Sequence, residues 1–260
     1  MNILVLVKQV PDPEALVEIA ASGKDLNIEP KFATNFFDEF ALEEALRMRE
    51  KHGGTVKVIS LGGPKAIEAL RTAIAMGADE ALLIEDESFA GSDGYNTALA
   101  LSRALEKETF DVVLCGRQAI DADRGEVPQM VAQFLGLPHV GVVVRLDVSD
   151  GKATAESSLE GAKEVIEVAL PAIFTAQKGL NEPRVPLITG VMKAMKVQIP
   201  KVPVEDLGLT RDMAGPESSK TRILRYLPPK KRPAVHLIEG EPGEAAAEAV
   251  RILMDVERVI

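Results

Sequence analysis

The residues whose types and spacing are best suited to chemistry lie in one stretch, Gly116–Pro128. It begins with a glycine and carries two arginines and three carboxylates. Glycine permits a tight turn, the N–H groups at the start of a following helix can meet a phosphate, and Arg117 or Arg124 can add positive charge. The stretch therefore has the parts of a nucleotide-binding loop. Ordinary strand-to-helix connections also begin with glycine and carry charge, and the stretch has neither a Walker loop nor a G-x-G-x-x-G pattern.

No pair of residues in the sequence is convincing as a nucleophile with its base. Asp121 and Asp123 lie two residues apart, which admits a paired-carboxylate hydrolase but favours solvation or a capping role. Cys115 follows an apolar run and is expected to be an inert core thiol. The three histidines are far apart and lack metal-ligand spacing. The sequence therefore predicts ligand binding without chemistry performed on the ligand.

Two predicted strands bring this stretch to a ligand-binding position. The apolar run Asp111–Cys115 precedes it, and a helix over Gln129–Leu135 follows it. A first strand over Ile3–Val7 is followed by Lys8 and two nearby prolines, which prevent an immediate helix. Open α/β sheets bind ligands at the carboxyl ends of their strands, so Lys8 is either an anion contact or a solvated surface lysine.

The first half of the chain alternates between strand and helix patterns. Further strands are predicted over Thr55–Leu61 and Ala81–Ile84, and helices over Ala41–Lys51, Ala66–Met76 and Asp93–Glu108. This alternation predicts an α/β fold with a doubly wound, mainly parallel sheet and right-handed crossovers.

The pattern changes to a period of two after Gly141. Runs that alternate in this way, separated by glycine-containing turns, predict antiparallel hairpins at one edge of the sheet. These runs are Val142–Leu146, Lys152–Ser158 and Lys163–Val168. A further buried strand is predicted over Pro171–Ala176, a helix over Leu187–Lys196, and a hairpin-like excursion over Glu14–Pro30.

The sequence predicts two parts, an α/β domain over 1–200 and a C-terminal arm over 201–260. Prolines recur from Pro203 to Pro242, and the arm ends in an amphipathic helix over Gly243–Val259. An arm broken by prolines and ending in a helix is suited to lie over a partner protein. The alternative is a strap over this protein's own sheet.

Composition excludes several classes of function. The chain has 260 residues and a formal net charge of −10, which argues against a nucleic-acid partner because that role needs a basic surface. No apolar run approaches the roughly 18 residues of a membrane span. A single cysteine rules out a disulfide framework. The predicted strand at the N-terminus leaves no room for a signal peptide, so a cytoplasmic protein without membrane insertion is expected.

Several blocks together resemble the small (β) subunit of electron-transfer flavoproteins. They fall in the order and spacing of that family and are much more specific in combination than singly. The blocks are Val7–Asp12, Asn35–Arg47, Ala75–Asp79, Gly116–Asp123, Leu180–Arg184 and Met192–Ala194.

The resemblance implies one half of a heterodimer. The large (α) subunit would carry a redox-active FAD, and this chain would hold AMP in an adenine-nucleotide-hydrolase-like fold without hydrolysing it. With Lys8 added from its position after the first strand, the implied cofactor-binding residues are Leu6, Lys8, Asn35, Phe36, Phe37, Asp38, Leu61, Gly116, Arg117, Gln118, Ala119, Ile120, Asp121, Ala122, Asp123, Arg124, Gly125, Glu126 and Val127.

The resemblance also implies a docking segment for acyl-CoA dehydrogenases in fatty-acid β-oxidation. Ile188 stands where the family has a leucine that anchors in the dehydrogenase, with Arg184 and Lys193 as flanking charges. Electrons would pass from the FAD to the membrane enzyme ETF-quinone oxidoreductase, and the arm would wrap the large subunit. The implied docking residues are Asn181, Glu182, Pro183, Arg184, Ile188, Met192 and Lys193.

An alternative within the family is an electron-bifurcating subunit, which holds a second FAD in place of AMP and oxidises NADH. In those members the Gly116 loop continues with Gly and Thr, where this chain has Ala122 and Arg124, which favours AMP. Residues Ala90–Asp93, however, resemble a loop of bifurcating members. Outside the family, a stand-alone nucleotide sensor is disfavoured by the long arm, and an ATP pyrophosphatase by the absence of a phosphate loop after the first strand.

Overall fold

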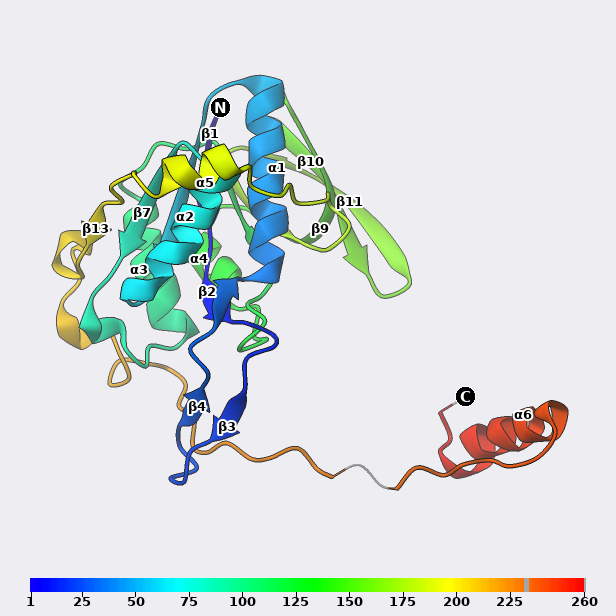
Figure 1. Ribbon diagram of the computed structural model, residues 1–260. Helices are drawn as coiled ribbons and strands as arrows, with labels where there is room; N and C mark the ends of the chain where they lie inside the picture. Colours follow the sequence, from blue (N-terminus) through cyan, green and yellow to red (C-terminus); the bar gives the residue numbers. More distant parts are fainter. Residues whose placement is uncertain (232–233, 260) are drawn as a thin grey trace. The chain divides into compact units, whose positions relative to one another are not determined.

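A computed structural model describes residues 1–231 and 234–259, so Arg232, Pro233 and Ile260 of the predicted arm lie outside the described residues. The chain divides into two compact units, Met1–Arg225 and Tyr226–Ile260 (Figure 1). Each is described by itself. The first unit includes residues 201–225, which the sequence assigns to the arm.

The first unit is built on one large mixed sheet. Among the described residues nine strands form it, in the order β11-β10-β9-β12-β8-β1-β6-β7-β13. The strands from β9 to β13 in this order pair in parallel, and β9, β10 and β11 pair antiparallel at one edge. The bounds are β1 Asn2–Leu6, β6 Thr55–Leu61, β7 Glu80–Ile84, β8 Val112–Gly116, β9 His139–Ser149, β10 Lys152–Leu159, β11 Ala162–Ala169, β12 Ala172–Ala176 and β13 Lys201–Val202.

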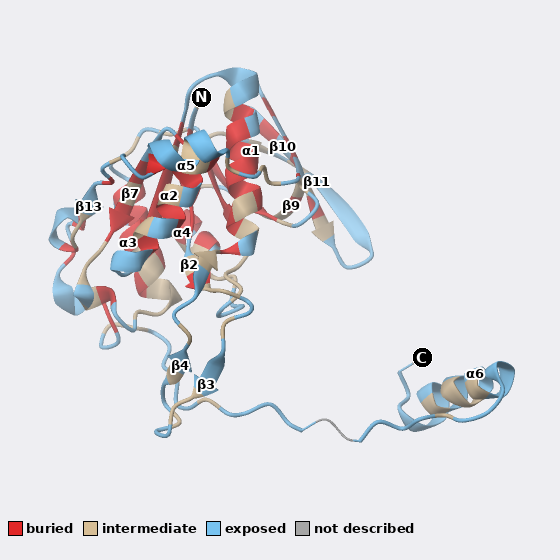
Figure 2. Cartoon of the chain, viewed as in Figure 1, coloured by how far each residue is buried: buried red, intermediate tan, exposed pale blue. Residues whose placement is uncertain are grey.

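Helices cover both faces of the sheet, as a doubly wound fold requires. One hydrophobic cluster joins α1, α2 and α5 to one face, and a second joins α3, α4 and residues 204–214 to the other. Figure 2 shows the buried residues concentrated in the strands and on the inner sides of these helices. The helices are α1 Phe36–His52, α2 Ile67–Met76, α3 Gly94–Leu105, α4 Val127–Leu135 and α5 Ile188–Ala194, with 3-10 turns at Pro64–Ala66 and Glu87–Phe89. The predicted α/β fold class is confirmed.

The predicted antiparallel edge is present with one difference. The expected strand Val142–Leu146 belongs to the longer β9, whose first residues pair in parallel with β12 before it continues against β10. Val142 has a φ of 54°, and the register of the β9–β12 pair shifts nearby. This irregularity lets one strand serve both the parallel core and the antiparallel edge.

Two small hairpin-like sheets project from the carboxyl edge of the central strands. β2 Gln9–Pro11 pairs with β5 Phe32–Thr34, and β3 Val17–Ile19 pairs with β4 Leu26–Ile28. The second pair is the excursion predicted over Glu14–Pro30. Figure 1 shows β3 and β4 below β2, projecting away from the sheet.

Residues 204–214 pack on the face of the sheet that carries α3. Val204, Leu207 and Leu209 are buried there, around 3-10 turns at Glu205–Leu207 and Arg211–Met213. The second unit contains α6 Pro242–Arg251, followed by a π-helical turn at Ile252–Val256. Among the described residues, no helix combines the length and the apolarity that crossing a bilayer requires.

Candidate functional site

The carboxyl ends of β1 and β8 lie side by side at the centre of the sheet. Leu6 pairs in register with Cys115, so Lys8 and Gly116 follow from neighbouring strands. A Cβ on Gly116 would overlap the Oδ1 atom of Asp38 and lie 2.6 Å from the Cβ of Phe37. The start of α1 therefore packs against the backbone where the Gly116 loop begins, and only glycine fits there.

Asp38 joins three segments of this edge. Its buried carboxylate accepts hydrogen bonds from the backbone N–H of Lys8 at 2.7 Å, the backbone N–H of Gly116 at 3.0 Å and the Nδ2 of Asn35 at 2.9 Å. Burial raises the pKa of Asp38 to about 7, although the three donors favour the charged form. The carboxylate is used within the protein, as a joint between β1, β8 and α1.

Asn35 holds the middle of the Gly116 loop. Its Oδ1 accepts a hydrogen bond from the N–H of Ile120 at 3.0 Å, and its Nδ2 donates to the carbonyl of Gln118 at 2.9 Å. Asn35 occupies the N-cap position of α1, but its side chain makes no capping bond. It satisfies the loop instead, which explains why a polar side chain is buried at this position.

The loop is also folded on itself. Asp123 has a φ of 55°, and its N–H donates to the carbonyl of Ala119 at 2.8 Å. The Nε2 of Gln118 donates to Asp123, and the guanidinium of Arg117 lies 5.2 Å from the centre of the Phe37 ring. These contacts preform the loop without a ligand.

Two cations of the edge, Lys8 and Arg124, form ion pairs. The Nζ of Lys8 contacts both carboxylate oxygens of Asp121, at 2.8 and 2.7 Å. Arg124 contacts Glu126 at 3.4 Å and donates to the Oγ1 of Thr221 at 3.1 Å. The side chain of Lys8 is 47% exposed and pairs with Asp121, so its contact to a ligand anion stays a prediction.

The structure brings the predicted cofactor-binding residues to this one edge. Leu6 is buried at the end of β1, and Leu61 ends the neighbouring strand β6. Of the consecutive phenylalanines, Phe36 is exposed and Phe37 packs against Gly116 and Arg117. The predicted inert thiol, Cys115, is buried, and burial raises its pKa.

Sequence reasoning missed the junction around Asp93, at the N-terminus of α3. One carboxylate oxygen of Asp93 accepts from the N–H groups of Lys220 and Thr221 at 2.7 and 2.8 Å. The other oxygen caps α3 through the N–H of Asn96 at 3.1 Å. Thr221 in turn reaches Arg124, so residues from the end of the first unit complete the site. The N-cap signal at Asp93 is legible in sequence, but its partners 127 and 128 residues away are not.

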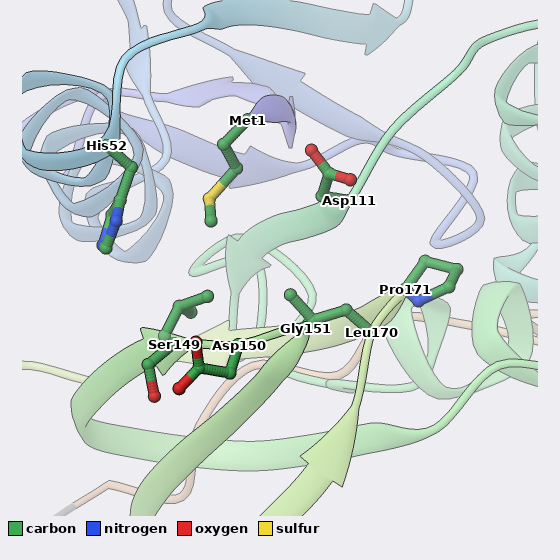
Figure 3. A pocket seen from close by; sticks show the side chains of 9 residues that line it. Met1, His52, Asp111, Ser149, Asp150, Gly151, Leu170 and Pro171 are labelled. Carbon is green, nitrogen blue, oxygen red and sulfur yellow. The ribbon is translucent and has the colours of Figure 1, made fainter.

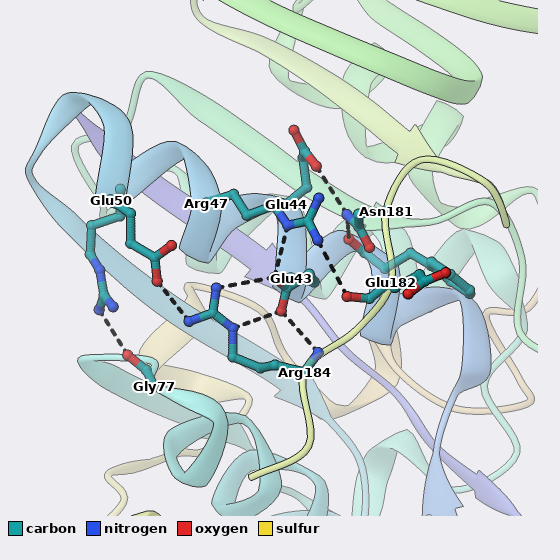
Figure 4. A network of polar contacts seen from close by, with 10 residues as sticks. Glu43, Glu44, Arg47, Glu50, Gly77, Asn181, Glu182 and Arg184 are labelled. Carbon is teal, nitrogen blue, oxygen red and sulfur yellow. Dashed lines mark hydrogen bonds and ion pairs between the residues drawn. The ribbon is translucent and has the colours of Figure 1, made fainter. Parts of the chain in front are cut away.

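The predicted docking segment is fastened to α1 by a polar network (Figure 4). The buried Glu43 accepts from the N–H, Nε and Nη2 of Arg184 at 3.1, 2.8 and 3.0 Å, and from the Nε of Arg47 at 2.9 Å. Arg184 also contacts Glu50 at 2.6 Å. The Nδ2 of Asn181 donates to the carbonyl of Phe40 and to Glu44. Burial raises the pKa of Glu43, but its arginine partners outweigh this and leave it below the ordinary value.

Beyond this fastened base, the segment exposes apolar side chains. Ile188 is 80% exposed, and a Cβ on Gly190 would overlap the carbonyl oxygen of Ala75, so α5 lies directly on α2. Glu182 and Lys193 are exposed and Pro183 is half-buried. The exposed apolar side chains are Val185, Leu187, Ile188, Val191, Met192 and Met195.

A cavity of about 450 Å³ lies at the opposite edge of the sheet (Figure 3). Met1 and Asp111, which precede β1 and β8, line it together with His52 and residues 149–151. Ligands of open α/β sheets bind at the carboxyl edge, so this cavity is not the candidate site. Within the described ranges, no three His, Cys, Asp or Glu side chains gather as a metal site requires.

Comparison with known proteins identifies the family of this chain. The family described as "Electron transfer flavoprotein domain" matches residues 29–207. The "Electron transfer flavoprotein subunit beta" of Bacillus subtilis is 40% identical over the whole of both chains. The chain belongs to the electron transfer flavoprotein family. The family resemblance inferred from its motifs is confirmed.

Two further relatives belong to complexes with different names. The "Electron transfer flavoprotein subunit beta" of Thermoanaerobacterium thermosaccharolyticum is 43% identical over 97% of this chain and 98% of its own. The "Caffeyl-CoA reductase-Etf complex subunit CarD" of Acetobacterium woodii is 38% identical over 92% of both chains. The electron transfer flavoprotein relatives thus include subunits named for different complexes.

Proposed function

We propose that this chain is the β subunit of an electron transfer flavoprotein heterodimer and catalyses no bond change itself. It pairs with the large α subunit, whose FAD accepts electrons from acyl-CoA dehydrogenases and passes them to ETF-quinone oxidoreductase. In this chain AMP binds at the carboxyl edge of β1 and β8, and the cytoplasm is the expected location. The observation that carries the proposal is the preformed Gly116 loop, which Asp38 and Asn35 hold at that edge.

The hydrogen bonds of Asp38 and Asn35 to the Gly116 loop favour a permanently bound cofactor as the ligand, and not a transient substrate. A loop tied at Gly116, Gln118 and Ile120 has little conformational entropy left to lose, so the free energy of binding is not spent on ordering it. Among the described residues, the site offers backbone groups, two ion pairs and the Asp38 carboxyl, which is engaged by three N–H donors. Such a site suits a nucleotide that is held without being converted.

The docking role rests on the contrast within residues 181–195. The base of the segment is fixed by Arg184 on Glu43, whereas Ile188 and its apolar neighbours are exposed. An exposed apolar anchor on a fixed base is suited to a complex that must form and separate quickly. In the same proposal, the part of the arm beyond Arg225, where the first unit ends, serves the large subunit.

A second candidate function is a bifurcating β subunit, which would hold a second FAD and oxidise NADH. The 38% identity to a subunit of a caffeyl-CoA reductase-Etf complex favours it, as does the Ala90–Asp93 loop. Against it stand Ala122 and Arg124, where bifurcating members have Gly and Thr. Arg124 is also engaged with Glu126 and Thr221.

The nucleotide content of the heterodimer tests the proposal. The chain is co-expressed with its large subunit, the purified complex is denatured, and the released nucleotides are quantified by chromatography. One FAD and one AMP per heterodimer are expected. Two FAD, with NADH oxidation, would establish the bifurcating alternative, and failure to form any complex would overturn both.

A further inference from the structure

The ion pair between Lys8 and Asp121 spans the two central loops of the candidate site. Lys8 follows β1, Asp121 lies in the Gly116 loop, and the two residues are 113 positions apart. The Nζ of Lys8 contacts both carboxylate oxygens of Asp121, so the carboxylate occupies the position beside the ammonium group that another anion could take. Both side chains are accessible, with 47% and 25% of their surfaces exposed. A ligand at this edge can therefore reach the pair.

The backbones on both sides of the pair are fixed, whereas the side chains can move. The N–H of Lys8 donates to Asp38, and its carbonyl accepts from the N–H of Asn35 at 2.9 Å. On the other side, Ile120 is held by Asn35. Because the lysine side chain is long and flexible, it can leave Asp121 without disturbing the loop.

Lys8 is a cation of the edge that can be released at little cost in stability. Arg117 lies over the Phe37 ring and donates to the Oε1 of Gln118 at 3.0 Å, and Arg124 contacts Glu126 and Thr221. Lys8 has one carboxylate partner, and an exposed ion pair of this kind contributes little to stability. A doubly charged phosphate is a stronger partner for an ammonium group than a single carboxylate.

The charges of the edge also limit what can bind. Lys8 and the Gly116 loop together carry three positive charges, on Lys8, Arg117 and Arg124, and three negative charges, on Asp121, Asp123 and Glu126, so this part of the edge has no net charge. A site without net positive charge can release one lysine for one phosphate. It has nothing further to offset the additional charge of a di- or triphosphate.

We propose that Asp121 is a placeholder for the ligand's phosphate and, through Lys8, a specificity determinant of the nucleotide site. The inference rests on the proposed nucleotide-binding function. Asp121 holds the ammonium group of Lys8 in the ligand-free protein. The phosphate takes its place when the nucleotide binds, and the displaced carboxylate repels ligands with more phosphate charge.

The two members of the pair therefore have opposite effects on affinity, and this is the test. The heterodimer is stripped of nucleotide, and AMP, ADP and ATP are titrated by calorimetry. Asp121→Asn is expected to tighten AMP by about two- to five-fold, because no ion pair must open. Lys8→Gln is expected to weaken AMP by about ten-fold or more. In the Lys8→Gln background, Asp121→Asn is expected to bring a smaller gain than in the wild type, because no ion pair has to open and only the repulsion between carboxylate and phosphate is removed.

The series of phosphates sharpens the assignment. Asp121→Asn is expected to help ATP more than AMP, which narrows the preference for the monophosphate. Asp123→Asn is the matched control, because it removes the same charge from the same loop without touching Lys8. Its effect on AMP is expected to be smaller than that of Asp121→Asn. Asp121→Ser is a second variant without the carboxylate, and it shows whether the effect of Asp121→Asn comes from the new amide group.

The results separate this inference from the proposed function. If Asp121→Asn and Asp121→Ser lower the affinity for AMP, the ion pair is needed in the bound state. The placeholder role of Asp121 is then overturned, while AMP binding itself stands. If the wild-type heterodimer takes FAD in place of AMP, the site accepts a diphosphate, and the specificity assigned to Lys8 and Asp121 is overturned together with AMP binding. If it binds neither, the proposed function and this inference fall together.

Discussion

Two irregular segments of this protein are fastened to the same helix in different ways. The Gly116 loop is tied to Asp38 and the docking segment 181–195 to Glu43, and both acids lie on α1. Asp38 receives three uncharged N–H donors, and burial raises its pKa to about 7. Glu43 receives Arg184 and Arg47, which leave its pKa below the ordinary value.

The difference corresponds to what each segment presents. The Gly116 loop turns its backbone toward a small site, and Asp38 holds it through hydrogen bonds from three uncharged N–H donors. The predicted docking segment carries its apolar side chains outward, and an ion pair in which Arg184 donates three hydrogen bonds to Glu43 secures its base. Two carboxyl groups on one helix, Asp38 and Glu43, thus make two kinds of attachment. Four substitutions can distinguish their effects.

The largest effect is expected from Arg184→Ala. Removing the guanidinium leaves the buried Glu43 with Arg47 alone, and breaking such a pair costs about 3 kcal/mol of the free energy of unfolding. Urea unfolding measures it. Arg103→Ala is the control, since its partner Glu106 is exposed and less than about 1 kcal/mol is expected. Equal losses in the two variants would show that the Glu43 network has no special role.

The next effect is expected from Gly116→Ala. The added methyl group overlaps Asp38 and Phe37, so the loop must shift, at a cost of about 2 kcal/mol in the free energy of unfolding. Bound nucleotide is expected to fall sharply, while docking to the dehydrogenase is spared. Gly63→Ala is the matched control, because a Cβ there meets nothing. Full nucleotide content in the Gly116 variant would place the pocket elsewhere.

A smaller effect, dependent on pH, is expected from Asp38. Its pKa in the folded protein is above its usual value, so the folded state binds the proton more tightly. Its stabilising contribution is therefore complete below about pH 4 and is lost as the pH rises through about 7, by at most about 1.4 kcal/mol per pH unit.

Urea unfolding between pH 4.5 and 7.5 measures this dependence. Asp38→Asn, which does not titrate, is expected to remove that part of the slope, and Asp150→Asn on an exposed turn is the control. Glu43, with its lowered pKa, contributes in the opposite direction, because its stabilisation is lost only as the pH falls through that pKa. An unchanged slope in Asp38→Asn would show that this carboxyl does not titrate in that range.

The smallest effect on the protein itself is expected from Ile188→Ala. The side chain is 80% exposed, so stability and nucleotide content should not change. Reduction of the heterodimer's FAD by an acyl-CoA dehydrogenase should weaken by about five- to ten-fold, the loss of one apolar anchor. Leu16→Ala, exposed on the β3–β4 side, is the control. An unchanged rate would exclude this segment as the docking site.

Much of the fold could be predicted because local patterns carry it. The strand predicted over Thr55–Leu61 has those bounds in the structure, and the Asp111–Cys115 strand differs by one residue. Continuous apolar runs mark strands buried on both faces, and Gly77 and Gly136 end their helices as such residues do. The burial of residues 204–214 was not predicted, because their apolar side chains follow no helical or strand period.

By itself, the sequence determined the order of strands and helices, the edge at which a ligand would bind, and the family. Those properties depend on neighbouring residues or on strand direction. Only the tertiary structure decided that Lys8 meets Asp121 and that Arg184, predicted to be a flanking charge for a partner, lies on Glu43. These partners are 113 and 141 residues apart, and ion pairing acts through space without leaving a pattern along the chain.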